Sequence, residues 1–488
     1  MAEISMGCVP EHYAGSWGDR VALVYGATSL TWRELAGRVE RRAHGLKALG
    51  VEAGDMVTIA LPNGCEFLET TYAALRLGAT PNPVPAKMPM AELKAIVELA
   101  KPKVIVGVER EAWPGWQSVG QDWVGETSNV ALPDTTALHW KAMTSGGSTG
   151  RPKLIVSRSP AIVDLDTANP LMGMSAGRAC SLIPGPLYHN GPFLMAMLSL
   201  NQGRRMVGQL RFDPEEMLRL IEEHRADWLY QVPTMMSRVW ALPAEVRGRY
   251  DVSSLERVLH LAAPCPAWLK EAWIGWLGPE RVWELYGGTE GQGFTLISGS
   301  EWQSHRGSVG KFINASVKIL DDAGNELPTG EIGEVFMLPQ SGAGSTYHYV
   351  GASARVHGDF ESLGDMGWLD ADGYLYLADR RTDLILRGGA NIYPAEVEAA
   401  IDEHPNVASS VVIGLPHVDL GAEVYAIVQL KPGVAHADAD VALKTFLKEH
   451  LAAYKIPASF EFVDDFLRDE AGKVRRAALR AERIAARR

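Results

Sequence analysis

Residues 144–153 form the segment of this sequence whose side chains most clearly suggest chemistry. Glycines let backbone N–H groups approach an anion closely, hydroxyls add donors, and Lys153 or Arg151 supplies positive charge. The sequence therefore predicts a phosphate-binding loop, with an ordinary Gly/Ser-rich surface loop as the alternative. The residues of this loop that we assign to phosphate binding are Thr144, Ser145, Gly146, Gly147, Ser148, Thr149, Gly150 and Lys153.

This loop is not a Walker loop, in which Gly-Lys-Ser/Thr closes the segment just before a helix. Here Pro152 follows Arg151 and disfavours helical backbone at that point. The interpretation of the loop therefore depends on the other motifs of the chain.

Five further motifs follow the loop in the chain. They are Tyr286-Gly287-Gly288-Thr289-Glu290, Gly364-Asp365-Met366-Gly367-Trp368, Asp379-Arg380-Arg381-Thr382-Asp383, Gly388-Gly389-Ala390-Asn391-Ile392-Tyr393-Pro394 and Gly472-Lys473. In this order the segments resemble the core motifs of the adenylate-forming superfamily, which comprises acyl- and aryl-CoA synthetases, luciferases and peptide-synthetase adenylation domains. The resemblance spans nearly the whole chain. It implies an acid-thiol ligase, an AMP-forming acyl-CoA synthetase that uses ATP, Mg²⁺ and CoA.

Three segments resemble one subgroup more closely, the bile-acid and steroid side-chain CoA ligases. They are Gly146–Gly150, Leu187–Gly191 and Ala262–Pro266. Other acid ligases of the superfamily remain the alternative.

The resemblance assigns the first half-reaction to residues around the nucleotide. When a carboxylate attacks the α-phosphate of ATP, negative charge accumulates, so cations and aligned donors must dominate the site. Thr289 would face the α-phosphate and Glu290 would bind Mg²⁺, although a Thr-Glu pair is also common at a helix N-terminus. Lys473 would reach over from the small domain to the carboxylate and the α-phosphate, and its alternative is a surface lysine. Leu467 and Asp469 stand where the family usually has Pro and Thr, which puts the rigidity of that loop in doubt.

Other motif residues would bind the nucleoside and the thiol. Asp365 would accept hydrogen bonds from the ribose hydroxyls and Arg380 would contact ribose or phosphate, or these residues belong to a turn and a linker. Tyr286 would stack on adenine or would be a core aromatic. The remaining nucleotide contacts would come from Ala263, Pro264 and Gly287. After rotation of the small domain, Gly388 and Gly389 would border a thiol channel, and their alternative is a plain turn.

The acid is expected to be bulky and mostly apolar: a steroid or bile acid, an arylalkanoic acid or a fatty acid. Gly288 stands where a larger side chain is common in the family, which would widen the acid pocket. Six methionines nearby in sequence supply adaptable apolar surface or fill the core: Met172, Met174, Met195, Met197, Met235 and Met236. His189 would gate the pocket or stabilise the carboxylate, and a structural histidine is its equal alternative.

Two other functions remain open. An adenylating enzyme of the same kind would pass the acyl group to an amine or to the pantetheine arm of a carrier protein. A non-catalytic nucleotide or acyl-CoA binding protein is disfavoured, because it would not need Lys473, Glu290 and the complete phosphate loop.

The composition of the chain restricts the class of protein and the cellular location that this chemistry could have. The chain has 488 residues, 47% of them hydrophobic, and a net charge of −12, which argues against non-specific nucleic-acid binding. Four widely spaced cysteines without CxxC spacing favour a reducing, cytoplasmic location. We find neither a signal peptide nor a transmembrane run in the sequence, and the partners expected are small molecules, with a homodimer left open.

The elements that position these residues follow an α/β pattern. Thr31 and Glu34 form a capping box, and Asp213 caps a helix that begins at Pro214. Alternating helices and strands predict a large N-terminal domain of layered α/β subdomains over 1–379 with parallel strands. A hinge at 380–382 and a smaller, mobile α+β domain over 383–488 follow, with Thr382 at a position where the family usually has Asp or Lys.

Overall fold

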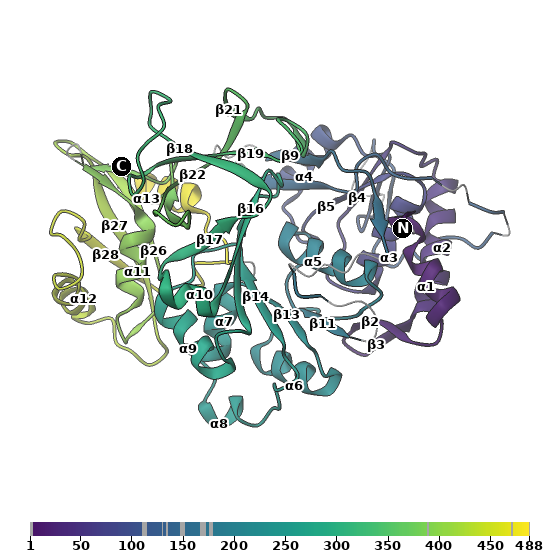
Figure 1. The fold of residues 1–488 in the computed structure, drawn as a ribbon, viewed down its shortest axis with the longest axis horizontal. Coiled ribbons are helices and arrows are strands. Elements are labelled where there is room, and N and C mark those ends of the chain that lie inside the picture. Colours follow the sequence, from purple (N-terminus) through teal and green to yellow (C-terminus); the bar gives the residue numbers. More distant parts are fainter. Residues whose placement is uncertain are drawn as a thin grey trace.

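The computed structural model describes residues 3–109, 115–128, 130–132, 135–146, 152–165, 172–174, 179–387, 390–469 and 472–487, with the backbone only at 145 and 146. The large domain occupies most of Figure 1, and the small domain lies at one end of it, opposite the first helices of the chain. The motif residues at 147–151, 388 and 389 lie outside the described residues.

A 14-stranded sheet crosses the large domain and changes character along its length. Six of its strands form a parallel ladder, in the spatial order β2 (Val21–Tyr25), β12 (Arg205–Gly208), β11 (Cys180–Ile183), β13 (Trp228–Gln231), β14 (Arg257–Leu261) and β15 (Val282–Gly287). Beyond β15 the neighbours are antiparallel: β16 (Phe294–Ser298), β17 (Ser308–Phe312), β23 (Leu375–Arg380), β22 (Phe360–Leu369), β19 (Gly333–Pro339) and β18 (Ala315–Leu320). The expected parallel layering is thus correct for one half of the sheet.

Helices cover this sheet with strongly apolar faces. The helices that contribute to the main hydrophobic core include α2 (Trp32–Ala48), α3 (Cys65–Arg76), α5 (Asn190–Asn201), α6 (Pro214–His224), α7 (Pro233–Trp240) and α9 (Ala267–Leu277). The capping box of α2 is present, because Thr31 Oγ1 accepts from Glu34 N at 3.2 Å and Glu34 accepts from Thr31 N at 2.8 Å. Asp213 likewise accepts from Glu216 N at 2.8 Å, so both predicted helix starts are confirmed.

Three smaller sheets complete the described part of the large domain, and one of them is the antiparallel pair of β1 (Glu3–Ser5) and β10 (Ile162–Asp164). The two larger ones are as follows. One is parallel, with β5 (Thr80–Pro83), β4 (Met56–Ile59), β6 (Val104–Val106) and β7 (Ser118–Val119). The other is antiparallel, with β20 (Tyr347–Val350), β9 (Pro152–Ser157) and β8 (Ala142–Gly146). The segment that begins at Pro152 is therefore a strand, which agrees with the expectation that this proline disfavours helical backbone.

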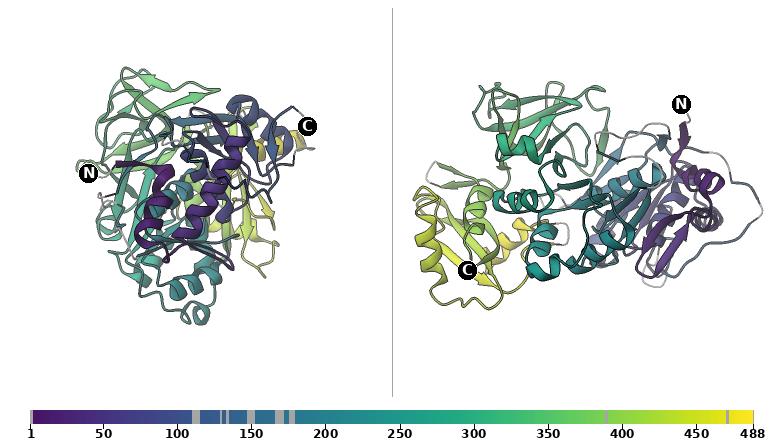
Figure 2. Two further views of the ribbon diagram at one scale, coloured as in Figure 1. Left: turned by 90° about the vertical axis from the view of Figure 1, so that its right-hand side faces the viewer. Right: turned by 60° about the horizontal axis from the view of Figure 1, so that its bottom comes forward.

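The small domain has a core of its own, which includes Ile385, Val412 and Leu443. Its sheet joins β26 (Val407–His417), β27 (Gly421–Leu430) and β28 (Ser459–Val463), and a short hairpin joins β24 (Ile385–Arg387) to β25 (Ala390–Ile392). The helices are α11 (Pro394–Asp402), α12 (Ala439–Leu447) and α13 (Arg476–Ala486). Figure 2 shows this unit beside the large domain rather than within it, which confirms the predicted fold class.

Within the part of the chain that the structure describes, no helix combines the length and the apolarity that a membrane crossing requires.

Candidate functional site

Glu290 is the centre of a compact polar cluster. It lies in the turn between β15 and β16 and is 7% exposed. Tyr349 donates to Glu290 Oε1 at 2.6 Å, and Lys153 Nζ lies 3.6 Å from the same oxygen. Lys153 Nζ also lies 3.8 Å from the centroid of the Tyr349 ring. Burial, followed by the charge of Glu290, raises the pKa of Tyr349, so the phenol remains a hydrogen-bond donor.

Pairing of β9 with β20 places Lys153 beside Tyr349, and both side chains reach the turn that carries Glu290. Thr289 and Glu290 are in a turn, so the alternative of a helix N-terminus is wrong.

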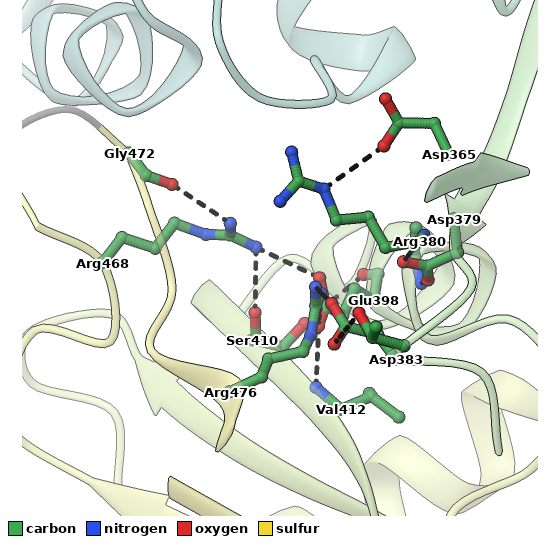
Figure 3. Close-up of polar contacts among 12 residues, drawn as sticks. Asp365, Asp379, Arg380, Asp383, Glu398, Ser410, Val412, Arg468, Gly472 and Arg476 are labelled. Atoms are coloured by element: carbon green, nitrogen blue, oxygen red, sulfur yellow. Dashed lines mark hydrogen bonds and ion pairs between the residues drawn. The ribbon is translucent and has the colours of Figure 1, made fainter. Parts of the chain in front are cut away.

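The predicted nucleoside-binding residues also lie together. Asp365 on β22 faces Arg380 on β23 in direct register, and Arg380 Nε donates to Asp365 Oδ1 at 3.2 Å (Figure 3). Tyr286 on β15 donates to Asp365 Oδ2 at 2.7 Å. Burial, and then the charge of Asp365, raises the pKa of Tyr286, which keeps its proton. Strand β15 and the distant hairpin of β22 and β23 therefore hold one buried carboxylate between a phenol and a guanidinium.

The loop that carries Lys473 touches the large domain. A Cβ atom built on Gly472 would lie 2.9 Å from Thr234 Oγ1 and 3.8 Å from Ala263 Cβ. Asp469 accepts from Lys473 N at 2.8 Å, and Asp469 N donates to Lys473 O at 3.0 Å. Asp469, which stands where the family usually has Thr, therefore binds the backbone of Lys473 through two hydrogen bonds.

Lys473 is an exposed residue of the loop that contacts the large domain. Loss of solvent around its ammonium group lowers the pKa, and the charge of Arg380 acts in the same direction. Asp469 and Glu290 oppose that shift. Lys473 therefore lies within electrostatic range of both the nucleoside cluster and Glu290.

His189 precedes α5 and faces the same region. Burial, and then the charge of Lys473, lowers the pKa of its imidazole to about 3. Its Nε2 atom is buried and has no hydrogen-bond partner among the described residues. A neutral imidazole can offer a hydrogen bond to a substrate but cannot supply positive charge to a carboxylate.

An ionic network within the small domain surrounds Glu398 (Figure 3). Glu398 on α11 accepts from Arg468 at 3.2 Å and from Arg476 at 2.5 Å, and Arg476 also donates to Asp383 at 3.1 Å. Asp379, the next-to-last residue of β23, accepts from Ala395 N at 2.6 Å and so caps the start of α11. The network ties α11, the Lys473 loop and the segment after Arg380 together.

Two residues with functional potential were missed in the sequence. Tyr349 lies in the segment after the Gly/Ser-rich patch at 341–345, and a strand with alternating aromatics at 347 and 349 was the available signal. Lys141 is buried at 6% exposure and donates to Asn190 Oδ1. The feature of the sequence that could have indicated Lys141 is a lysine within the otherwise apolar run Trp140–Met143.

The expected widening of the acid pocket at Gly288 is not supported. A Cβ atom at this position would lie 2.5 Å from Leu363 Cδ1 and 2.9 Å from Glu290 Oε2, so neighbouring side chains already fill that direction. All six methionines that we considered are buried and belong to the main hydrophobic core. They fill the core, which was the alternative interpretation.

The remaining assigned residues are placed as follows. Thr144 accepts from Asn82 Nδ2 at 3.3 Å, and Ser145 and Gly146 continue β8. Gly287 ends β15, and Pro264 is exposed next to Ala263. Gly147, Ser148, Thr149, Gly150, Gly388 and Gly389 lie outside the described residues.

Glu290 suits a magnesium ion that is shared with a phosphate chain. Mg²⁺ is commonly held by one or two carboxylates together with substrate phosphates and water. The described residues contain no group of three or more His, Cys, Asp or Glu side chains that could hold a metal. A single buried carboxylate fits this mode of binding, in which the substrate supplies the other oxygens.

Comparisons with known proteins show the family and the fold of this chain. The profile of the AMP-binding enzyme family matches residues 10–344, and that of the AMP-binding enzyme C-terminal domain matches residues 396–473. A feruloyl-CoA synthase of Amycolatopsis sp. is 32% identical over 504 residues, which cover 96% of this chain and 98% of the relative.

Two solved structures share the fold. The o-succinylbenzoate CoA synthetase of Bacillus subtilis, in complex with its acyl-adenylate intermediate, has a TM-score of 0.82 at 26% identity and covers 98% of both chains. An amide bond synthetase of Marinactinospora thermotolerans has a TM-score of 0.80 at 24% identity and covers 98% of this chain and 99% of the other.

Proposed function

The chain belongs to the AMP-binding enzyme family, and we propose that it is an AMP-forming acid–CoA ligase. This membership bears out the adenylate-forming relationship that the motifs predicted; the closer similarity to bile-acid ligases stays a prediction. In the proposed reaction a carboxylate oxygen bonds to the α-phosphorus of ATP as pyrophosphate leaves. The sulfur of CoA then bonds to the acyl carbon, AMP leaves, and the thiol proton is released.

The observation that carries this proposal is the position of Lys473. The contact of Gly472 with Thr234 and Ala263, and the effect of the charges of Arg380 and Glu290 on Lys473, support a position of the ammonium at the large-domain site. A fixed cation there would stabilise the charge that develops on the α-phosphate. This arrangement suits the first half-reaction.

The other residues would take complementary roles. Asp365 and Arg380 would hold the ribose, Tyr286 would border the adenine, and Lys153 would contact the phosphates. When bound, Mg²⁺ would offset repulsion between phosphate oxygens, and Glu290, kept in place by Tyr349, is the residue that would hold it. Neutral His189 would donate a hydrogen bond to the acid.

We favour an acid that carries an aromatic ring, a group that includes the arylalkanoic acids considered above, because a relative is named for feruloyl-CoA and a Cβ atom on Gly288 would meet Leu363 and Glu290. Bile, steroid and fatty acids remain candidates. The second candidate function transfers the acyl group to an amine or to a carrier protein, since an amide bond synthetase shares the fold. The dispersed cysteines favour a cytoplasmic location, with a homodimer as an open possibility.

The proposal is tested by measuring pyrophosphate release with ATP and Mg²⁺ across ferulate, 2-succinylbenzoate, octanoate and cholate. Each reaction is run with CoA, with an amine mixture and with a holo carrier protein, and the product mass is read at the end. Acyl-CoA formation supports the ligase. Acyl-AMP that accumulates despite CoA and is consumed by an amine or carrier protein would replace it with the second candidate.

A further inference from the structure

Lys141 is a buried cation that the proposed roles leave unused. It directly precedes β8, and only 6% of its surface is exposed. Its ammonium donates to Asn190 Oδ1 and lies 4.5 Å from the centroid of the Trp140 ring. Both of these partners are neutral, so neither compensates the charge with a full negative charge.

Comparison with Lys270, another buried lysine, shows that Lys141 lacks a carboxylate partner among the described residues. Lys270 is also buried, and its Nζ pairs with Glu284 Oε2 at 2.6 Å. No carboxylate of the described residues forms such an ion pair with Lys141, whereas Glu290 pairs with Lys153. A buried ammonium is costly unless an anion accompanies it. Burial accordingly lowers the pKa of Lys141 to about 7, against an opposing effect of Glu290.

The surroundings of Lys141 point toward a ligand. Asn190, its partner, is the first residue of α5, and the N-terminus of a helix favours anions. The preceding residue, His189, has a buried Nε2 without a hydrogen-bond partner among the described residues. Lys141 also directly precedes β8, which carries Thr144 and Ser145 of the predicted phosphate-binding loop, and the charge of Glu290 acts on Lys141, so this corner borders the predicted nucleotide site.

We propose that Lys141 is a further substrate-binding residue, whose ammonium contacts an anionic oxygen of a bound substrate. That oxygen belongs either to the phosphate chain of ATP or to the acid, and the two sources share the same recognition chemistry. The inference rests on the proposed ligase function for the identity of these substrates. The bound anion supplies the counter-charge that Asn190 and Trp140 do not.

The test compares Lys141→Met with Lys141→Gln, and with Lys94→Met on α4 (Met90–Ala100) as an exposed lysine control. Calorimetry gives the Kd of ATP with Mg²⁺, of pyrophosphate and of AMP. Pyrophosphate release gives KM and kcat for the acid that the unchanged enzyme converts fastest. Thermal unfolding establishes that the variants fold, which we expect because replacing an unpaired buried charge by a side chain of similar shape is often neutral or stabilising.

For the Lys141 variants we expect either the Kd of ATP and pyrophosphate or the KM of the acid to rise by roughly 10- to 100-fold, the range for a hydrogen bond to a charged group. Weaker ATP and pyrophosphate binding with unchanged AMP binding identifies the phosphate chain; a raised KM for the acid alone identifies the acid. Affinities and KM values within twofold of those of Lys94→Met would overturn the inference. If the unchanged enzyme converts no acid, the ligase proposal fails separately, and the nucleotide arm alone decides the role of Lys141.

Discussion

Gly472 of the small domain lies against Thr234 of the large domain, and Lys473 follows directly. The φ of Gly472 is +77°, and a Cβ atom there would approach Thr234 Oγ1 to 2.9 Å. Gly472→Ala should therefore displace Lys473 and slow pyrophosphate release by about tenfold, because a left-handed conformation alone costs a non-glycine residue roughly 1–2 kcal/mol.

Gly433→Ala is the matched control, since Gly433 has a φ of +85° and open space around its Cβ direction. Transfer of the acyl group from preformed acyl-AMP to CoA should be unchanged in both variants. Equal slowing of both half-reactions by Gly472→Ala would show that the contact with Thr234 does not belong to adenylation.

Lys473→Gln should slow acyl-AMP formation by roughly 10²–10⁴, the effect of removing one group that stabilises developing charge. The loop should persist, because Asp469 accepts a hydrogen bond from the backbone N–H of residue 473, which the substitution keeps. Rapid-quench measurement of acyl-AMP checks the rate, with Lys448→Gln on the exposed end of α12 as control. A variant that forms acyl-AMP at the normal rate would remove Lys473 from the first step.

Tyr349→Phe should raise the Mg²⁺ concentration for half-maximal adenylation by about 10- to 100-fold, the range for losing a group that orients a metal ligand. The phenol donates to Glu290 Oε1 at 2.6 Å, and without it Lys153 is the partner of that carboxylate that remains among the described residues. Direct Mg²⁺–ATP titration by calorimetry provides a readout besides turnover. Tyr376→Phe removes a comparable hydrogen bond to Asp370 elsewhere in the domain and should leave the Mg²⁺ dependence intact.

The neutrality of His189 has a consequence for stability. Its pKa is lowered to about 3 in the folded state, against about 6.5 in the unfolded chain, so the unfolded chain binds more protons between these values. The free energy of unfolding of the unchanged protein, relative to His189→Gln, should therefore rise from about pH 4 to pH 6.5 and then level off. The slope approaches about 1.4 kcal/mol per pH unit. Urea unfolding at several pH values checks this, and a pH-independent difference would contradict it.

Local rules were sufficient to predict much of the fold. The capping box at Thr31 and the cap at Asp213 depend on residues only three positions apart, so the sequence reveals them directly. The antiparallel half of the sheet was not predicted, because β17 and β23 pair across more than sixty residues. The sequence indicated strands over 409–413 and 424–430, whereas β26 and β27 span Val407–His417 and Gly421–Leu430.

The residues of the candidate site divide in the same way, into those that the sequence indicated and those whose role depends on contacts seen only in the structure. Motif resemblance singled out Asp365, Arg380 and Tyr286, and the structure places all three in contact. Tyr349 escaped notice because its role depends on a hydrogen bond across 59 positions to Glu290. The hydrogen bonds between Asp469 and the backbone of Lys473 were likewise visible only in the structure, since the sequence alone showed only a departure from the family's usual residues.

The most direct test of the ligase account follows the carboxylate oxygen. The acid that the enzyme converts to acyl-CoA is labelled with ¹⁸O in both carboxylate oxygens and incubated with ATP, Mg²⁺ and CoA, and the products are analysed by mass. Attack on the α-phosphorus followed by thiol transfer predicts AMP that carries one ¹⁸O and acyl-CoA that retains the other. Unlabelled AMP, or ADP and phosphate in its place, would contradict an acyl-adenylate intermediate and with it the proposed function.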